Sequence, residues 1–514
     1  MEGVTRTTAG VVRGAEERRV WVFRGIPYAR TGGPAGRFEP PAPVVPWAGV
    51  RDAGAWGPIA PQAPPVPGFS LPGDPTEADE DCLNLNVWTP GPDDGGRPVL
   101  VWVHGGGFTT GTGASALYDG RHLAAKGVVV VTINYRLGAL GLLAHPDLAT
   151  NGHGWGNWGL RDQIAALRWV RDNIGAFGGD PGNVTVMGES AGAMSIGDLL
   201  ASSESSGLFH RAVLQSGPPA TAGAAWAVRR AERLAVHAGV DPGRPADLRA
   251  VPASALVAAT QQLAAEAPAH GDLPLPLLPV VDGALLEAPP GGAVAEGSAV
   301  AVPLLVGTTR DEATLFTVAQ LADPTLDEAA VVARLAPMVG EAAAAQVVEV
   351  YRRARAERGE PVGGGALWSA LTTDYVFRVP LHTLATWHAQ YQASTYAYLF
   401  TWASPFLGGM FGSCHGLDIP FVFGTVADPA VEVFTGGGPG AAELTEQMQR
   451  AWIAFATTGD PSCDEVGAWP TYDPVRRPTM VLGPGGGVHD DPRGPERRAW
   501  GEAGVVVGAG HHHV

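Results

Sequence analysis

The chain has 514 residues, of which 45% are hydrophobic and 17% are charged, and its formal charge is −17. This composition is typical of a soluble globular protein that is long enough to bury a large core. The acidic balance argues against a nucleic-acid partner, because phosphate backbones are bound by clustered positive charge. No run approaches the roughly 18 apolar residues of a membrane-spanning helix, so we expect no membrane partner.

The N-terminal sequence and the cysteines predict a cytoplasmic protein. Residues 1–10 lack the basic and apolar regions of a signal peptide. Cys82, Cys414 and Cys463 lie far apart without a C-x-x-C pair, which suits a reducing compartment and argues against a zinc site. The histidine tract at 511–513 could touch a metal, but we interpret it as a tail or tag and exclude it from the site.

Short, continuous apolar runs recur along the chain and predict strands that are covered on both faces. They span residues 98–103, 127–135, 183–188, 211–217, 302–309 and 394–400. Between them, apolar residues at helical spacing predict a helix over 159–177, which a Gly-Gly-Asp-Pro stretch ends. Strands that alternate with helices predict an α/β fold: a doubly wound, mostly parallel sheet with helices on both faces.

Two long segments differ from this alternating pattern. Residues 220–300 and 317–392 are rich in alanine and helical in character, and we expect them to form helical insertions beside or over the sheet. Glycine runs at 363–365 and 436–440 predict loops. No change of composition separates two independent units, so we expect residues 1–514 to form a single domain.

A G-x-S-x-G stretch, GESAG, places Ser190 between a predicted strand and a predicted helix at 191–201. Such a corner exposes a serine hydroxyl on a strained turn, and the following helix offers its N-terminal N–H groups to a developing anion. Gly188 and Gly192 carry no side chain that would collide across the turn. Ser190 is therefore a candidate nucleophile, and a plain turn with a capping serine is the alternative.

A second glycine-rich stretch, VWVHGGGF at 101–108, follows another predicted buried strand. In α/β-hydrolases an HGGG loop supplies part of the oxyanion hole, because consecutive glycines let backbone N–H groups approach one point. The alternative, a nucleotide-binding loop, lacks the GK[ST] ending and the G-x-G-x-x-G spacing. Together with GESAG about eighty residues later, this loop favours a serine hydrolase.

Longer stretches are similar to the type-B carboxylesterases, the cholinesterase-like branch of the α/β-hydrolases, in order along nearly the whole chain. They are FRGIPYA (23–29), RFEPP (37–41), EDCLNLNVWTP (80–90), NYRLGALGLL (134–143), GNWGLRDQIAALRWVRDNIGAFGGDPGNVTVMGESAG (156–192) and LQSGPP (214–219). The resemblance implies an α/β-hydrolase fold with helical insertions over the active site. It also implies an esterase similar to the bacterial p-nitrobenzyl type.

The resemblance supplies partners for Ser190. VGTTRDEATLF is similar to the acid-bearing segment of the family and implies Glu312 as the triad acid, with Asp311 as the neighbouring alternative. GSCHGLDIPFVFG is similar to the segment of the catalytic histidine and implies His415. The family usually has glycine where Ala313 stands, so this turn is expected to be slightly altered.

The resemblance also implies an oxyanion hole made by the backbone N–H groups of Gly106, Gly107 and Ala191. In the implied mechanism, His415 takes the proton of Ser190 as the hydroxyl oxygen attacks an ester carbonyl. An acyl-enzyme forms, and water then releases the acid. This chemistry requires no metal or cofactor.

The chain departs from its relatives at two places between residues 60 and 82. Ala60 stands where many relatives have a cysteine that bridges to the one matching Cys82, so we expect no disulfide there. The same loop contains no tryptophan, whereas choline-specific relatives carry a cation-binding tryptophan in it. This absence argues against a cholinesterase.

Other residues are expected near the site without an assigned catalytic role. Glu189 and Ser216 match family positions close to the triad, and Asp418 follows His415 by three, but each is equally compatible with a structural polar role. Four apolar residues are candidates either for an apolar substrate pocket or for ordinary core: Phe108, Trp158, Leu315 and Phe316.

We therefore expect a carboxylic ester hydrolase of broad specificity that acts on short-to-medium uncharged esters, as a monomer or homodimer. One alternative is a carbamate or amide hydrolase that uses the same triad. A second alternative is a non-catalytic, cholinesterase-like binding module.

Overall fold

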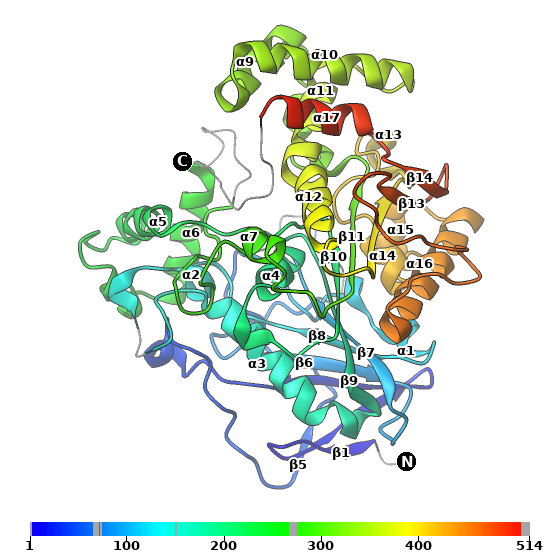
Figure 1. Cartoon of the computed structure of the whole chain (residues 1–514). Helices are drawn as coiled ribbons and strands as arrows, with labels where there is room; N and C mark the ends of the chain where they lie inside the picture. The colour runs from blue at the N-terminus through cyan, green and yellow to red at the C-terminus, as the bar shows by residue number, and fades with distance from the viewer. Residues whose placement is uncertain (1–2, 65–70, 72–73, 150–151, 267–274, 505–514) are drawn as a thin grey trace.

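An 11-stranded mixed sheet forms the centre of the protein (Figure 1). The computed structural model describes residues 3–64, 71, 74–149, 152–266 and 275–504. In spatial order the strands are β14 (Gly487–Asp490), β13 (Pro478–Leu482), β12 (Thr395–Phe400), β11 (Leu304–Thr309), β10 (Arg211–Gln215), β9 (Gly179–Glu189), β7 (Arg97–Val103), β8 (Val129–Ile133), β6 (Asn84–Thr89), β4 (Val20–Pro27) and β3 (Ala15–Glu17). The central strands are parallel, and antiparallel strands flank them at both edges.

The six predicted apolar runs coincide with β7, β8, β9, β10, β11 and β12, which confirms the predicted α/β sheet. Every residue of β8, β11 and β12 is buried. These strands are mainly apolar rather than alternating, because helices cover both faces of the sheet.

Alternate residues of each strand enter two separate cores, since successive side chains point to opposite faces of a sheet. Val101 packs with α3 (Trp158–Asn173), α4 (Ala191–Leu199), α7 (Pro290–Ala295) and α12 (Val379–His388) on one face. Trp102 packs on the other face with α1 (Arg121–Ala124), α14 (Ile419–Phe423) and α16 (Pro439–Thr458). The helix predicted at 159–177 is α3 followed by a 3₁₀ turn, Ile174–Phe177.

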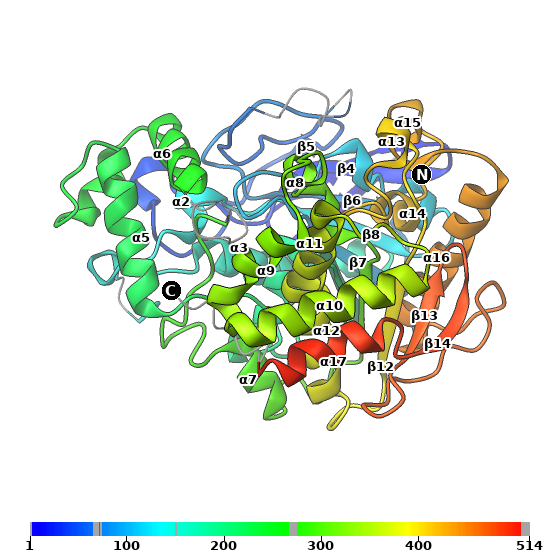
Figure 2. The same ribbon diagram turned by 90° about the horizontal axis from the view of Figure 1, so that it is seen from above.

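The two alanine-rich segments contain helices that lie outside these two layers (Figure 1). The first holds α5 (Ala224–His237) and α6 (Ala253–Glu266), which pack near α2 (Gly138–Leu142) around a separate apolar cluster. The second holds α8 (Val318–Leu321), α9 (Glu328–Val339), α10 (Glu341–Glu357) and α11 (Gly364–Thr373). The helix α17 (Gly494–Glu502) packs along α10, as the view from above shows (Figure 2). We call α9, α10, α11 and α17 the crown.

The loop predicted at 363–365 is wrong for its last two residues, because Gly364 and Gly365 begin α11. A Cβ added to Gly364 would lie 1.8 Å from the carbonyl oxygen of Leu326, and one on Gly365 would lie 2.2 Å from that of Gln320. These glycines therefore allow close packing of a helix rather than a flexible connection. At 436–440, the predicted loop is confined to the residues between α15 (Pro429–Thr435) and the start of α16.

Elements at the periphery complete the described chain. A small three-stranded sheet joins β1 (Val4–Arg6), β2 (Val11–Arg13) and β5 (Val50–Asp52), and α13 (Phe406–Gly409) precedes the loop of His415. The three cysteines are unpaired. Among the described residues, no helix combines the length and apolar character that crossing a membrane requires. The histidine tract at 511–513 lies outside the described residues.

Candidate active site

Four segments with predicted functional residues follow parallel strands at the same edge of the sheet. The HGGG loop follows β7, Ser190 follows β9, Glu312 follows β11, and the segment of His415 follows β12. Because β7, β9, β10, β11 and β12 pair in parallel, their carboxyl ends meet at one edge. Open α/β sheets bind ligands at this edge.

Ser190 occupies the corner between β9 and α4 in a strained conformation. Its φ is 55° and its ψ is −126°, which few residues other than glycine adopt. Its backbone N–H donates to the carbonyl oxygen of Gln215 over 2.9 Å, and its own carbonyl oxygen accepts from the N–H of Met194 over 2.8 Å. These contacts hold the side chain of Ser190 at the tip of the turn.

The glycines around the turn allow the loop after β7 to approach it closely. A Cβ on Gly192 would lie 2.0 Å from the carbonyl oxygen of Val103, and one on Gly188 would lie 2.7 Å from the same atom. A Cβ on Gly105 would lie 3.0 Å from the Cβ of Ser190. The HGGG loop therefore packs directly on the corner that carries Ser190.

The backbone of the HGGG loop adopts conformations that favour glycine. Gly106 has a φ of 104° and Gly107 a φ of 60°. The carbonyl oxygen of Gly106 accepts from the N–H groups of Thr109 and Thr110, each over 3.1 Å. Ala191 is the first residue of α4, where backbone N–H groups have no acceptor within the helix. This arrangement can direct donors from two segments toward an oxygen bound at Ser190.

Glu312 and His415 meet directly. Nδ1 of His415 lies 2.7 Å from Oε2 of Glu312, and the backbone N–H of Thr309 donates to Oε1 of the same carboxylate over 2.7 Å. Asp311, the alternative acid, instead accepts hydrogen bonds from the backbone N–H of Ser413 and from Arg310. The geometry thus pairs the histidine with Glu312 and gives Asp311 a different set of partners.

Glu189, the residue before Ser190, is a second carboxylate at the histidine. Its Oε1 lies 3.0 Å from Nε2 of His415. Burial disfavours the charged imidazole, but Glu189 and Glu312 outweigh it and raise the pKa of His415 to about 9. Burial also raises the pKa of Glu189 to about 8, although His415 acts against it. Among the described residues, no hydrogen bond joins the Ser190 hydroxyl to Nε2 of His415.

The other two polar residues expected near the triad, Asp418 and Ser216, are also buried. Asp418 accepts hydrogen bonds from Gln215 over 3.0 Å and from the hydroxyl of Tyr398 over 2.9 Å. Burial and the neighbouring Glu312 raise the pKa of Asp418 to about 6. Ser216 is fully buried with a φ of 52°.

The four candidate pocket residues separate into two groups. Phe316 is 43% exposed, and its ring centroid lies 5.1 Å from that of His415, so it borders the site. Leu315 is partly buried against the core. Trp158 and Phe108 belong to a core cluster with almost no exposed surface, and the indole N–H of Trp158 donates to the carbonyl oxygen of Leu143. Their burial agrees with the alternative of ordinary core, and a role in a substrate pocket stays a prediction.

The sequence analysis missed Phe377, whose ring packs at an angle of 42° against the histidine with a centroid distance of 4.9 Å. It lies in a five-residue π-helix, Asp374–Arg378, between α11 and α12. No spacing pattern in the sequence marks this segment, because the contact joins residues that are far apart in the chain.

The whole chain is similar to known esterases. A model of the carboxylesterase family matches residues 2–500. The para-nitrobenzyl esterase of Bacillus subtilis (strain 168) is 37% identical over 500 residues, which cover 96% of this chain and 98% of that protein. The phenmedipham hydrolase of Pseudarthrobacter oxydans is 38% identical over 496 residues, which cover 93% and 95%.

Among solved structures, a carboxylesterase of Geobacillus stearothermophilus matches with a TM-score of 0.83 at 38% identity, covering 97% of this chain and 100% of that one. The protein is thus an α/β-hydrolase, as the resemblance implied. The chain belongs to the carboxylesterase family and is a carboxylic ester hydrolase.

Proposed function

We propose that Ser190, His415 and Glu312 hydrolyse esters through an acyl-enzyme intermediate. The observation that carries this proposal is the 2.7 Å contact between His415 and Glu312, at the sheet edge where Ser190 ends β9. With Nδ1–H donating to Glu312, the imidazole is oriented so that Nε2 acts as the base once it has lost the proton that Glu189, 3.0 Å away, helps to hold. Hydrogen bonds between a catalytic base and its nucleophile are often long before substrate binds.

In the proposed reaction, Ser190 Oγ attacks the ester carbonyl while its proton moves to Nε2 of His415. The backbone N–H groups of Gly106, Gly107 and Ala191 stabilise the resulting oxyanion. His415 then gives its proton to the leaving alcohol, and the acyl group stays on Ser190. Water attacks the acyl-enzyme by the same steps and releases the carboxylic acid, so that no cofactor takes part.

We propose short-to-medium uncharged esters as substrates. The aromatic rings of Phe316 and Phe377 flank His415 and would favour apolar groups near the reacting carbonyl. The related esterase of Bacillus subtilis is named for para-nitrobenzyl esters, which are uncharged and of this size. We further propose a cytoplasmic enzyme that is a monomer or homodimer.

The replacement Ser190→Ala tests the nucleophile. We expect turnover of p-nitrophenyl butyrate to fall on the order of 10⁴-fold or more, because the acyl-enzyme cannot form. Ser202→Ala is a matched control, since Ser202 is a buried serine beyond the other end of α4. Activity of Ser190→Ala at the parent rate would falsify the proposal.

A second candidate function, hydrolysis of carbamates on the same triad, is separable by substrate. Two carbamate substrates are suitable for this comparison. One is a simple aryl carbamate, and the other is phenmedipham, for which the related hydrolase is named. We expect kcat/KM for p-nitrophenyl butyrate to exceed that for either compound. The opposite order would make carbamates the preferred class while leaving the triad in place.

A further inference from the structure

The π-helix between α11 and α12, together with the residue before it, contacts His415 and the backbone on either side of Glu312. Its hydrogen bond from the N–H of Val379 to the carbonyl oxygen of Asp374 spans five residues. Such π-helical turns are rare and occur often at functional sites. The residue before this segment, Thr373, and two within it, Phe377 and Arg378, make the contacts with the site. We call Thr373, Phe377 and Arg378 the clamp.

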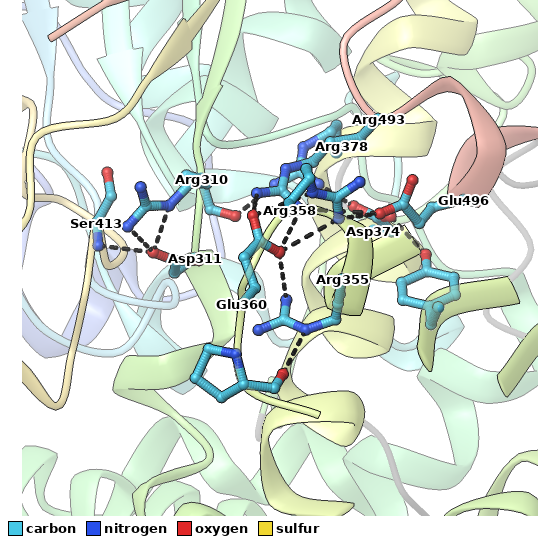
Figure 3. Close-up of polar contacts among 12 residues, drawn as sticks. Arg310, Asp311, Arg355, Arg358, Glu360, Asp374, Arg378, Ser413, Arg493 and Glu496 are labelled. Atoms are coloured by element: carbon cyan, nitrogen blue, oxygen red, sulfur yellow. Dashed lines mark hydrogen bonds and ion pairs between the residues drawn. The ribbon is translucent and has the colours of Figure 1, made fainter. Parts of the chain in front are cut away.

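Two members of the clamp hold the backbone on either side of Glu312. Arg378 donates to the carbonyl oxygen of Arg310 over 2.6 Å (Figure 3). It also donates to the carbonyl oxygen of Thr309 over 3.4 Å. After Glu312, the backbone N–H of Ala313 donates to the hydroxyl of Thr373 over 3.0 Å. The turn that presents Glu312 is thereby fixed from both ends by one segment.

The third member of the clamp packs on the histidine. The ring of Phe377 lies 4.9 Å from that of His415, at an angle of 42°. Hydrogen bonds between residues five apart bring Thr373 and Arg378 toward one face of the segment. In a regular α-helix, at 3.6 residues per turn, these two side chains would point in clearly different directions. The π-helical winding therefore allows all three contacts at once.

The crown in turn holds the clamp. Arg378 forms an ion pair with Asp374, and Asp374 accepts a hydrogen bond from the hydroxyl of Tyr351 in α10. The indole N–H of Trp500 in α17 donates to that hydroxyl over 2.7 Å. Arg378 and Asp374 are each no more than 5% exposed, so the ion pair is shielded from solvent.

We propose that the clamp is a positioning device for the triad, in which Arg378 and Thr373 set the place of Glu312 and Phe377 sets that of His415. The inference rests on the proposed triad and adds residues that act through it. Catalysis depends steeply on such placement, because a shift of about 1 Å can cost on the order of 10²-fold in rate.

The variant Arg378→Lys keeps the charge but cannot reproduce the two-carbonyl contact of a guanidinium. We expect kcat to fall on the order of tenfold or more while KM changes little. The acid limb of kcat/KM should also move to lower pH, because a displaced Glu312 no longer raises the pKa of His415.

Arg355→Lys is the matched control for Arg378→Lys. Arg355 is also buried, donates to the carbonyl oxygen of Pro361 over 2.8 Å and pairs with Glu360 (Figure 3). Within the described part of the chain, no hydrogen bond or ion pair joins it to the turn of Glu312. We expect it to lower stability without moving the pH profile. Equal kinetic effects of the two variants, or a parental kcat and pH profile in Arg378→Lys, would overturn the proposal.

A double-variant cycle separates this inference from the proposed function. If Arg378 acts through Glu312, Arg378→Lys should cost little further activity once Glu312 is replaced by Gln. If the two replacements instead lowered activity by independent factors that multiply in the double variant, the positioning role of the clamp would be refuted and the proposed triad would stand. Parental activity of Glu312→Gln alone would instead refute the triad.

A second pair of variants covers the case in which Arg378→Lys does not fold. Thr373→Val removes the hydroxyl that accepts from Ala313 and keeps the shape of the side chain, whereas Thr373→Ser retains the hydroxyl. We expect the valine variant to lose kcat and the serine variant to retain most of it. Equal kcat values for the two folded variants would contradict a positioning role for Thr373.

Discussion

Ser190 shows how a single residue depends on its neighbours for its conformation. A serine at a φ of 55° and a ψ of −126° costs about 1–3 kcal/mol relative to relaxed backbone. The backbone contacts to Gln215 and Met194 and the close packing of Gly188 and Gly192 on Val103 maintain this conformation. The strain belongs to the turn, and its effect is to present the hydroxyl outward.

The charge of Glu189 governs the pH dependence of the neighbouring histidine. Since the carboxylates of Glu189 and Glu312 favour the imidazolium, His415 becomes an available base only as the pH rises through its elevated pKa. Glu189→Gln removes one of these charges, so the pKa of His415 should fall. We expect the acid limb of kcat/KM for p-nitrophenyl butyrate to move to lower pH.

The control for this prediction is Glu204→Gln, which removes a carboxylate that pairs with Arg161 instead. Its acid limb should coincide with that of the parent enzyme. Because Glu189 and His415 titrate as a coupled pair, the limb of the parent belongs to both groups. An acid limb that stays in place or moves upward in Glu189→Gln would contradict the assigned influence of Glu189.

Much of the candidate site could be predicted one residue at a time. Local patterns mark Ser190 and the HGGG loop, and resemblance points to Glu312 and His415, which the structure places in contact. Their catalytic roles stay predictions. Arg378 could not be found in this way, because its importance depends on two carbonyl oxygens that belong to residues almost seventy positions earlier.

At the scale of elements, a strand could be predicted where burial on both faces requires a continuous run of apolar residues. Every residue of β11 and of β12 is buried, and their continuous apolar runs mark them in the sequence. The edge strand β14 is exposed at all four residues, so no apolar run marks it. The π-helix was also missed, since its winding reflects contacts on both sides rather than local propensity.

The start of α11 provides a test of packing at this scale. Gly364→Ala would place a methyl group 1.8 Å from the carbonyl oxygen of Leu326, so either α11 or the loop between α8 and α9 must shift. We expect a loss of about 1–3 kcal/mol in the free energy of unfolding, measured by denaturant titration. Activity should also decline, because α11 ends at Thr373 in the clamp.

Gly363→Ala is the control for α11. Among the described residues, no atom beyond its chain neighbours lies within 4 Å of a Cβ built there, and its φ of −64° suits any residue. Its stability should match that of the parent. If both variants lost the same free energy of unfolding, the close approach of Gly364 to Leu326 would not be the cause of the loss.

At the scale of the whole molecule, charged groups join the crown to the end of the described chain. Glu360, which follows α10, pairs with Arg493 over 2.6 Å and with Arg358 over 3.1 Å. Arg358 also pairs with Glu496 in α17. Segments more than 130 residues apart in the chain thus share one network (Figure 3).

This network should make stability sensitive to acid. Burial opposes the charge of Glu360, but Arg493 and Arg358 outweigh it and lower its pKa from 4.5 to about 2. The ionised carboxylate therefore stabilises the fold above about pH 4.5, and this contribution is lost as the pH falls toward 2. The shift corresponds to about 3 kcal/mol.

We expect Glu360→Gln to be less stable than the parent at neutral pH, and the difference to shrink as the pH falls through this window. Denaturant titrations at several pH values measure both effects. Glu349→Gln is the control, because Glu349 forms an exposed pair with Arg352 that should contribute little. If the difference in the free energy of unfolding between Glu360→Gln and the parent did not change with pH, ionisation of Glu360 could not be the source of the acid sensitivity.

Because α17 lies near the end of the described chain, it is synthesised after all the proposed catalytic residues. During synthesis, Ser190, Glu312 and His415 are added to the chain well before Trp500. The hydrogen bond from Trp500 to Tyr351, which supports the Asp374–Arg378 pair, therefore forms late. Until α17 docks, the apolar cluster around Tyr351 and the charges of Arg358 and Glu360 lack part of their cover. A chain cut short before this helix would hold every proposed catalytic residue and still present the exposed surface that chaperones and proteases recognise.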